Sequence, residues 1–264
     1  MGDRAQGGLT GMVGREAWTA AGPIGAPAIV FVHGTLLTRR QWDAPMRLLA
    51  ARYRCVAVDL PGHGRLADVP FTRDAAADVV ADAIAAESAD GRAVVVGLSL
   101  GGYVAIDAAA RHPELVAGLV LAGCSAEPDG LAALLFRALA RLLDGVPPSL
   151  LARADGWLFR FRYRERVARP VIEGGFWPAG GAAALRAIVG GRYLDRLAWL
   201  WTPVLLVNGA LDPVFGPAGA AWASACRSGR HLVIPRATHL APLDRPRAFA
   251  GIVARFAAGI AREA

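Results

Sequence analysis

The feature that most constrains this fold is a serine held between glycines, at residues 97–102 (GLSLGG). The residues before it, 93–96, form a short apolar, β-branched run that predicts a buried strand. The alanine-rich residues after it, 103–112, predict a helix. A sharp turn from strand to helix leaves no room for side chains at the flanking positions, so glycine occupies them. We therefore expect Ser99 to point out of the sheet, next to the free amides that begin the helix.

The order of the elements predicts an α/β fold. Between residues 28 and 122, buried-strand patterns alternate with helical ones, which is typical of a parallel sheet with helices on both faces. Thr72 is expected to cap one of these helices. A short antiparallel pair, residues 9–12 with 16–20, is expected ahead of the sheet. The other expected strands are 28–32, 55–59, 93–96 and 116–122, and the expected helices are 42–53, 72–87 and 103–112.

This alternation stops near residue 126 and resumes at residue 203. The 75 residues from 126 to 200 have helical periodicity, two Pro/Gly breaks (145–148 and 174–181) and no pattern of a buried strand. A helical block between two strands of one sheet indicates an insertion. We expect a core of residues 1–125 and 201–264 and a helical lid of residues 126–200. The last expected elements are strands at 203–207 and 231–234 and helices at 217–226 and 245–262.

Composition limits the possible classes of protein. Of the 264 residues, 55% are hydrophobic, yet no apolar run approaches the roughly 18 residues of a membrane span. The N-terminus is polar and glycine-rich, without an apolar signal core, so we expect a cytoplasmic protein that does not enter a membrane. The net charge is +7, but the basic residues are all arginine and are scattered among acids, which argues against a nucleic-acid partner.

Cofactors and metals are also not expected. Cys55, Cys124 and Cys226 have no paired spacing, so we expect buried free thiols. No metal-ligand cluster is visible in the sequence. The expected partner is a small-molecule substrate, bound by a monomer or a homodimer.

A serine hydroxyl is a poor nucleophile near neutral pH and needs a base, which in turn needs an orienting acid. His239 follows the last expected strand, at the end of the sheet where ligands bind in open α/β folds. His231 is a competing base, but it begins that strand, at the opposite end. Asp212 follows the preceding strand and is the expected acid, although a role in the turn before Pro213 is the alternative.

The charge that develops on a substrate carbonyl oxygen needs hydrogen-bond donors already in place. The expected donors are the amide of Leu100, at a helix N-terminus, and the amide of Thr35, in the loop after strand 28–32. Because both donors are backbone amides, Leu100 can donate a hydrogen bond although its side chain is apolar. His33 and His63 are of a catalytic residue type, but they lie in turns and are expected to brace these loops.

Four motifs in this order resemble the α/β-hydrolase superfamily from about residue 9 to the C-terminus. One G-x-S-x-G motif alone occurs by chance, but four motifs at the right spacing are a strong signal. The resemblance is to the lid-bearing serine esterases and 3-oxoadipate enol-lactonases. It implies a nucleophile elbow, a catalytic triad in the order Ser99, Asp212, His239, and an acyl-enzyme formed from a small to medium ester or lactone. The motifs are 31–34 (FVHG), 59–64 (DLPGHG), 97–102 (GLSLGG), and 209–212 (GALD) followed by 238–239 (TH).

Three positions that depart from patterns found within the superfamily reduce the number of possible reactions. Leu100 and Leu37 stand where haloperoxidase-like members commonly carry Met and Pro, which argues against perhydrolysis. Ser99 excludes the haloalkane dehalogenase and epoxide hydrolase branches, which use an aspartate there. Some relatives place the acid after the strand that ends near residue 124, where only Glu127 and Asp129 are available, but both resemble the first residues of the lid.

Two other functions remain open at this point. The same triad could perform carbon–carbon bond hydrolysis, lyase or other tailoring chemistry, since a fold does not determine a reaction. A ligand receptor with a slow triad is the second alternative. Turnover of esters, measured beside ligand binding, separates these functions.

The expected substrate pocket lies between the serine and the lid. Residues 157–166 alternate aromatic residues and arginines, and we expect a helix with Arg160 and Arg164 one turn apart, either solvated or bound to a substrate carboxylate. The lid holds eleven arginines against seven carboxylates, so an anionic substrate is allowed but not required. The expected pocket residues are Leu36, Trp157, Phe161, Trp177 and Leu240.

Overall fold

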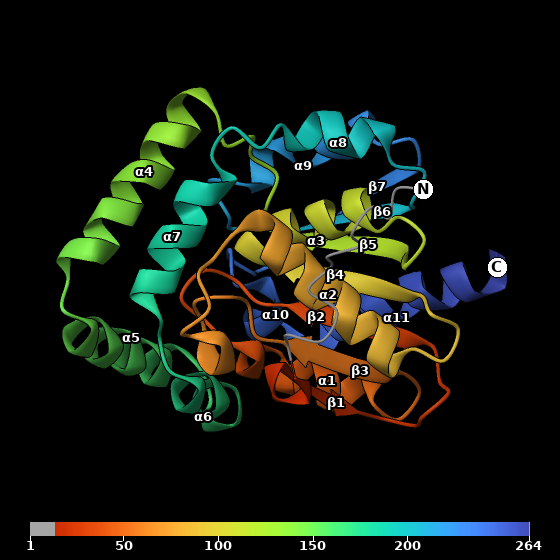
Figure 1. The fold of residues 1–264 in the computed structure, drawn as a ribbon, viewed down its shortest axis with the longest axis horizontal. Coiled ribbons are helices and arrows are strands. Elements are labelled where there is room, and N and C mark those ends of the chain that lie inside the picture. Colours follow the sequence, from red (N-terminus) through yellow and green to blue (C-terminus); the bar gives the residue numbers. More distant parts are fainter. Residues whose placement is uncertain (1–13, 264) are drawn as a thin grey trace, which may run out of the picture.

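The computed structural model describes residues 14–263 and contains a seven-stranded sheet in the order β1-β3-β2-β4-β5-β6-β7 (Figure 1). Strands β2 to β7 are parallel, and β1 pairs antiparallel with β3 at one edge. The other half of the expected antiparallel pair, residues 9–12, lies outside the described residues. The strands are β1 (Trp18–Ala21), β2 (Ala28–Val32), β3 (Arg54–Val58), β4 (Ala93–Leu98), β5 (Val116–Ala122), β6 (Val204–Gly209) and β7 (Gly229–Ile234).

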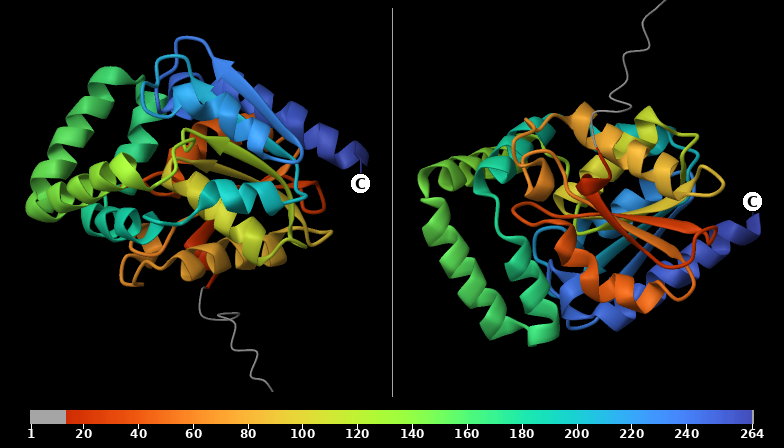
Figure 2. Two further views of the ribbon diagram at one scale, coloured as in Figure 1. Left: turned by 90° about the horizontal axis from the view of Figure 1, so that it is seen from above. Right: turned by 60° about the horizontal axis from the view of Figure 1, so that its bottom comes forward.

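Helices cover both faces of the sheet (Figure 2), which confirms the predicted α/β class. Successive strand residues point to opposite faces. Val30 and Val95 therefore join the core beneath α2 and α3, whereas Phe31 and Val96 join the core beneath α1 and α11. The Oγ1 atom of Thr72 accepts the Ala75 amide at 3.0 Å and caps α2, as predicted. The bounds are α1 (Asp43–Leu49), α2 (Arg73–Glu87), α3 (Leu100–Arg111), α9 (Gly219–Ala225), α10 (Ala241–Asp244) and α11 (Pro246–Glu263).

Five helices follow one another between β5 and β6. In Figures 1 and 2, α4, α5, α6 and α7 form a group at one end of the sheet, and α4 packs against α7. Helix α8 instead packs on α3 and α9, over the sheet. Within residues 14–263, no helix has both the length and the apolarity needed to cross a membrane. The bounds are α4 (Gly130–Gly145), α5 (Pro148–Arg162), α6 (Glu165–Gly174), α7 (Pro178–Ile188) and α8 (Tyr193–Trp199).

The helix boundaries correct several sequence-based expectations. The chain leaves the helical conformation at Tyr163, so Arg160 lies in the last turn of α5 while Arg164 precedes α6, and the two are not one turn apart on one helix. The predicted break at 174–181 is shorter, because Pro178 begins α7 as a proline at a first helical position. The predicted helix 42–53 is a 3₁₀ turn, Arg39–Trp42, followed by the short α1.

Parallel pairing brings the carboxyl ends of the strands to one edge of the sheet. Val32 of β2 pairs in register with Gly97 of β4, and Gly97 in turn pairs with Leu121 of β5. The loops that follow β2, β4, β6 and β7 therefore leave the sheet at the same edge, and these loops carry Thr35, Ser99, Asp212 and His239.

The turn after β4 depends on close backbone approach at Gly101, in the first turn of α3. An added Cβ would overlap the carbonyl oxygens of Val32 and His33, so we expect Gly101→Ala to destabilise the fold by about 3 kcal/mol or more. Gly259→Ala is the matched control, because nothing lies within 4 Å of a Cβ there. Since alanine is the better helix former, this change should stabilise α11 by roughly 0.5–1 kcal/mol. Urea unfolding measures both effects, and equal effects would contradict the close approach.

Candidate active site

Ser99 occupies the turn between β4 and α3 in a strained conformation. Its φ is 54° and its ψ is −120°, a region that costs a non-glycine residue on the order of 1–3 kcal/mol. The turn is held on both sides, because the Ser99 amide donates to Ala122 O at 2.8 Å and the Gly102 amide donates to Ser99 O at 2.8 Å. Ser99 is half-buried and occupies the N-cap position of α3. Strain of this kind typically marks functional sites.

Asp212 and His239 are joined across the next two loops. His239 Nδ1 lies 3.1 Å from Asp212 Oδ2, and the other carboxylate oxygen accepts the amides of Val214 and Phe215 at 3.0 and 3.1 Å. Burial alone would raise the pKa of Asp212, but the hydrogen bonds from His239 and these two amides lower it below its ordinary value. Asp212 is therefore a carboxylate near pH 7, able to hold one tautomer of the imidazole.

Two neighbours fix the plane of the His239 ring. The ring of Phe215 stacks on it with 4.9 Å between centroids and 24° between planes. The other neighbour of the His239 ring is Gly123, whose φ is 55°. A Cβ added at Gly123 would lie 2.8 Å from His239 Nδ1. A side chain at position 123 would displace the imidazole, so the glycine is needed both for its backbone conformation and for space.

The amides of Thr35 and Leu100 border the serine. Among residues 14–263, neither amide donates a hydrogen bond to a protein acceptor. The loop around Thr35 is braced, since the Gly34 amide donates to Gln41 Oε1 at 3.0 Å and the Leu37 amide donates to Gly34 O at 3.2 Å. Unpaired amides in a braced loop are suited to a developing oxyanion.

A cavity of about 360 Å³ joins these groups. Its polar lining consists of Thr35, Ser99, Tyr103 and His239, and the Tyr103 hydroxyl already donates to Ala126 O at 2.6 Å. Helices α4 and α7 cover it with Leu135, Phe136, Leu139, Leu185 and Ile188. The remaining lining residues are Gly34, Leu37, Leu98, Leu100, Val214, Phe215 and Leu240.

Comparison with known proteins decides the family. Residues 29–252 match the alpha/beta hydrolase family. The chain belongs to this family. The hydrolase is 31% identical over 257 residues to a pimeloyl-[acyl-carrier protein] methyl ester esterase of Neisseria meningitidis, an alignment that covers 90% of this chain and 96% of that esterase.

Solved structures agree with this assignment. A thermophilic esterase from Thermogutta terrifontis superposes on the hydrolase with a TM-score of 0.78 and 27% identity, covering 92% of this chain and 93% of the other. The enol-lactonase from Burkholderia xenovorans shares the fold, with a TM-score of 0.73, 22% identity and coverage of 90% and 95%. The protein is an alpha/beta hydrolase that acts on ester bonds.

Four of the five expected pocket residues do not line the cavity of this hydrolase; only Leu240 does. Trp157 and Phe161 stack on each other with 5.6 Å between their ring centroids, and their exposed fractions are 66% and 79%. Leu36 and Trp177 connect the loop after β2 to the start of α7, since the Trp177 amide donates to Leu36 O at 2.9 Å. The Trp177 side chain is held separately, because its Nε1 donates to Gly174 O at 3.1 Å.

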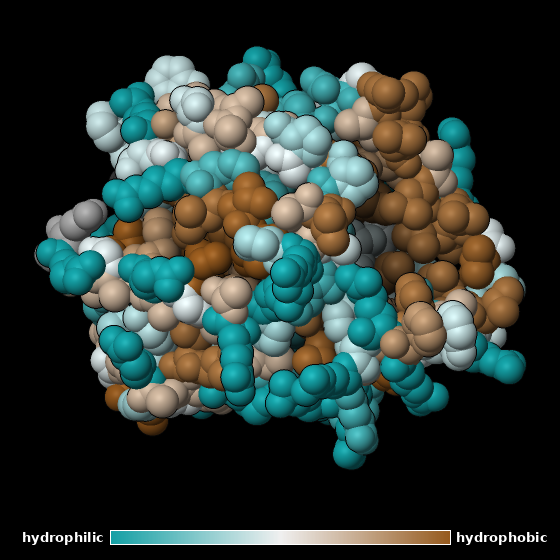
Figure 3. All heavy atoms as spheres, turned by 180° about the vertical axis from the view of Figure 1, so that it is seen from behind, coloured by the Kyte–Doolittle hydropathy of each residue, from teal (hydrophilic) through white to brown (hydrophobic). Residues whose placement is uncertain are grey.

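Two of the cavity residues that sequence reasoning missed, Leu135 and Leu139, lie on α4. Leu135 and Leu139 are one turn apart and both line the cavity while remaining largely exposed. They continue an exposed row that includes Leu131, Leu134 and Leu142. Figure 3 shows apolar residues gathered at the right-hand side of the molecule, where α4 lies. The row was visible as helical spacing, but the sequence alone does not show that it meets the serine.

The other histidines and acids of the hydrolase have structural contacts. His33 Nε2 accepts the Leu60 amide at 3.0 Å and its ring meets that of His63 edge to face at 4.9 Å. Burial lowers the pKa of His33 to about 4 and that of His63 to about 3, so both are neutral near pH 7. Glu127 accepts the amides of Tyr193 and Leu194 at 2.6 and 2.9 Å, at the start of α8.

Three further expectations concern positions outside the cavity. His231 bonds to Asn208 Oδ1 at 3.0 Å and does not line the cavity. Asp129 directly precedes α4, the first of the five helices between β5 and β6. The three cysteines are buried free thiols, and within residues 14–263 no group of His, Cys, Asp or Glu has the arrangement of a metal site.

Proposed function

We propose that this hydrolase cleaves carboxylic esters through an acyl-enzyme formed on Ser99. The single observation that carries the proposal is that Ser99 and His239 line one cavity while the Asp212 carboxylate holds His239 Nδ1 at 3.1 Å. Residues 126–200 act as a lid in this proposal, with α4 and α7 covering the acyl group. The amides of Thr35 and Leu100 bind the oxyanion.

The reaction follows from these positions. His239 Nε2 takes the hydroxyl proton of Ser99 as its Oγ bonds to the ester carbonyl carbon, and the carbonyl oxygen becomes an oxyanion. The tetrahedral intermediate collapses, the bond to the alcohol oxygen breaks, and His239 returns the proton to the leaving alcohol. Water then attacks the acyl-enzyme carbonyl and gives a proton to His239. The bond from the acyl carbon to Ser99 Oγ breaks, His239 returns the proton to Oγ, and the carboxylic acid is released. Asp212 keeps its negative charge throughout and stabilises the imidazolium.

The cavity favours an uncharged acyl group of small to medium size. Its volume of about 360 Å³ is at the lower end of ligand pockets, and its lining is apolar apart from the reacting groups. No arginine lines it, so a carboxylate at the far end of the acyl chain would lose its hydration without gaining a partner. The relative from Neisseria meningitidis is named for a methyl ester on an acyl chain, and methyl esters are the natural first substrates. A lactone presents the same carbonyl and is the second candidate, supported by the likeness to an enol-lactonase.

Labelling with a fluorophosphonate probe tests the nucleophile. We expect one adduct, mapped by peptide mass to Ser99, because only an activated serine displaces fluoride from phosphorus. A matched pair of esters tests the pocket: kcat/KM for methyl hexanoate should exceed that for monomethyl adipate by about tenfold or more, since the second carries a carboxylate. An adduct at another serine, or no adduct on the folded protein, would overturn the proposed nucleophile. Equal turnover of the two esters would overturn the assignment of the cavity.

A further inference from the structure

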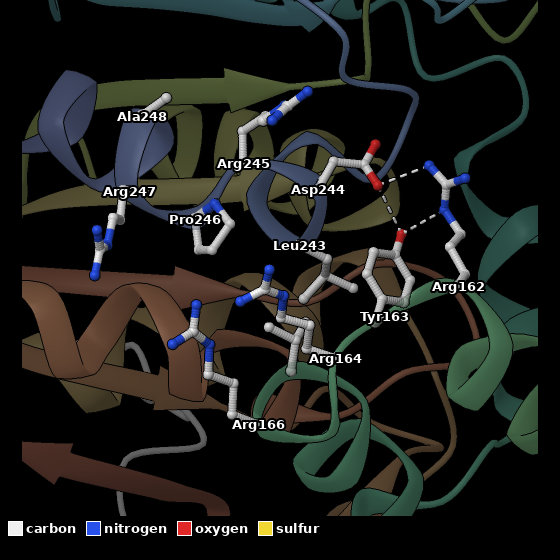
Figure 4. A pocket seen from close by; sticks show the side chains of 11 residues that line it. Arg162, Tyr163, Arg164, Arg166, Leu243, Asp244, Arg245, Pro246, Arg247 and Ala248 are labelled. Carbon is white, nitrogen blue, oxygen red and sulfur yellow. Dashed lines mark hydrogen bonds and ion pairs between the residues drawn. The ribbon is translucent and has the colours of Figure 1, made fainter.

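We propose that a second pocket, lined by the α5–α6 junction and by residues that follow His239 in the chain, binds a phosphate-type anion. The pocket has a volume of about 690 Å³ and lies between the α5–α6 junction, α10 and the first turn of α11 (Figure 4). It does not share a lining residue with the cavity at Ser99. Its lining residues are Arg162, Tyr163, Arg164, Arg166, Val167, Leu243, Asp244, Arg245, Pro246, Arg247 and Ala248.

The pocket carries a large excess of positive charge. Five arginines line it against one carboxylate, that of Asp244. Arg164, Arg166, Arg245 and Arg247 form no ion pair within the described part of the chain. Other arginines in the inserted segment do find carboxylates, such as Arg169 with Glu173 and Arg186 with Asp144. A group of unpaired guanidinium groups around one hollow repels itself, and an anion relieves that repulsion.

Asp244 cannot serve as the missing counter-ion, because its oxygens are already occupied. One oxygen accepts from Arg162 at 2.7 Å and from the Tyr163 hydroxyl at 3.0 Å. The other accepts the Thr238 amide and hydroxyl at 2.6 and 2.7 Å. Burial alone would raise the pKa of Asp244, but these bonds lower it. In Figure 4, dashed lines join Arg162 to Asp244 and Tyr163, whereas Arg164, Arg166 and Arg247 have none.

The beginning of α11 adds a second source of positive potential. This helix has 18 residues, and its first turn contains no acidic residue. Pro246 has no N–H, and within residues 14–263 the amides of Arg247 and Ala248 have no acceptor. The positive end of a long helix dipole therefore faces the same hollow as the arginines.

Phosphate is the anion that suits these donors best. Guanidinium groups bind phosphate oxygens in paired, fork-like hydrogen bonds, and helix amides bind the remaining oxygens. Val167, Leu243 and Ala248 give the pocket an apolar floor, so a phosphate ester with a small organic group also fits its composition. The arginines are exposed to solvent, and binding should therefore weaken as salt concentration rises.

Isothermal titration of the protein with inorganic phosphate, pyrophosphate and phenyl phosphate tests the site, and sodium chloride of equal ionic strength is the control. We expect saturable binding of one equivalent. Tighter binding of phenyl phosphate than of phosphate would identify a phosphate ester as the ligand class, and tighter binding of pyrophosphate would identify a polyphosphate.

The double variant Arg166→Gln/Arg247→Gln should weaken that binding by about tenfold or more, because it removes two charge-assisted contacts. Arg141→Gln is the matched control, an exposed arginine on α4 that lines neither pocket, and its affinity should change less than about twofold. Circular dichroism and ester turnover verify that both proteins are folded. No binding beyond the chloride control, or equal weakening in both proteins, would overturn the site.

Discussion

Ser99→Ala should lower kcat for ester cleavage by on the order of 10⁴-fold to 10⁶-fold while leaving the fold intact. The variant removes only the Oγ atom that would bond to the carbonyl carbon. The hydrogen bonds that hold the turn, Ser99 N to Ala122 O and Gly102 N to Ser99 O, are made by the backbone and remain. Alanine adopts the strained φ of 54° at about the same cost as serine. Steady-state kinetics on a methyl ester measures the loss.

The control for this variant is Ser224→Ala, an exposed serine on α9 whose hydroxyl donates to Ala220 O at 3.0 Å. We expect its kcat to stay within about twofold of the natural protein. Any activity left in Ser99→Ala should reflect binding and oxyanion stabilisation without covalent chemistry. A tenth or more of the natural kcat in Ser99→Ala would show that another group attacks the ester.

The fold, and the position of Ser99, Asp212 and His239 at one end of its sheet, follow from local rules that can be applied to the sequence alone. Buried strands such as 93–96 are apolar on both faces, and a parallel sheet gathers their carboxyl ends at one edge. Any side chain directly after such a strand, such as Asp212 or His239, must then lie near that edge. The glycines around Ser99 and the hydroxyl of Thr72 are equally local signals, because each satisfies its own turn or helix end.

The pocket could not be predicted in the same way, because it depends on how the helices between β5 and β6 pack. Aromatic residues are usually largely buried, but α5 packs mainly on α6, and Trp157 and Phe161 remain exposed to solvent. Leu135 and Leu139 have the helical spacing of any buried face. Which face of α4 meets Ser99 is decided by the contact of α4 with α7, a tertiary interaction with no sequence signal of its own.

The pocket lined by arginines also could not be predicted from the sequence, because its residues come together only in the folded chain. Arg164 and Arg166 lie about 80 residues from Arg245 and Arg247 in the sequence, where they look like members of a scattered, solvated set. The break at Tyr163 and the start of α11 at Pro246 bring them to one hollow. Charge counts along the chain therefore underestimate local potential, since potential depends on distance in space.

Asp212→Asn should lower kcat by about 10⁴-fold with little change in the melting temperature. Asp212 Oδ1 accepts two amides, from Val214 and Phe215, at 3.0 and 3.1 Å. An asparagine must keep its oxygen toward these two donors, so its NH₂ group faces His239 Nδ1. The imidazole then has to accept a hydrogen bond at Nδ1 and carry its proton on Nε2. Because Nε2 is the nitrogen that must take the proton of Ser99, the base is blocked while the loop keeps its hydrogen bonds.

Two measurements separate this effect from general damage to the loop. The ¹⁵N NMR signals of the His239 ring should report protonation at Nδ1 in the natural protein and at Nε2 in Asp212→Asn. Asp195→Asn, which changes an exposed carboxylate on α8, should leave both kcat and the ring signals unchanged. If Asp212→Asn retained kcat within about tenfold of the natural protein, Asp212 would not orient the base. Its hydrogen bonds would then serve only the turn after β6, and the attack by Ser99 would need another route for its proton.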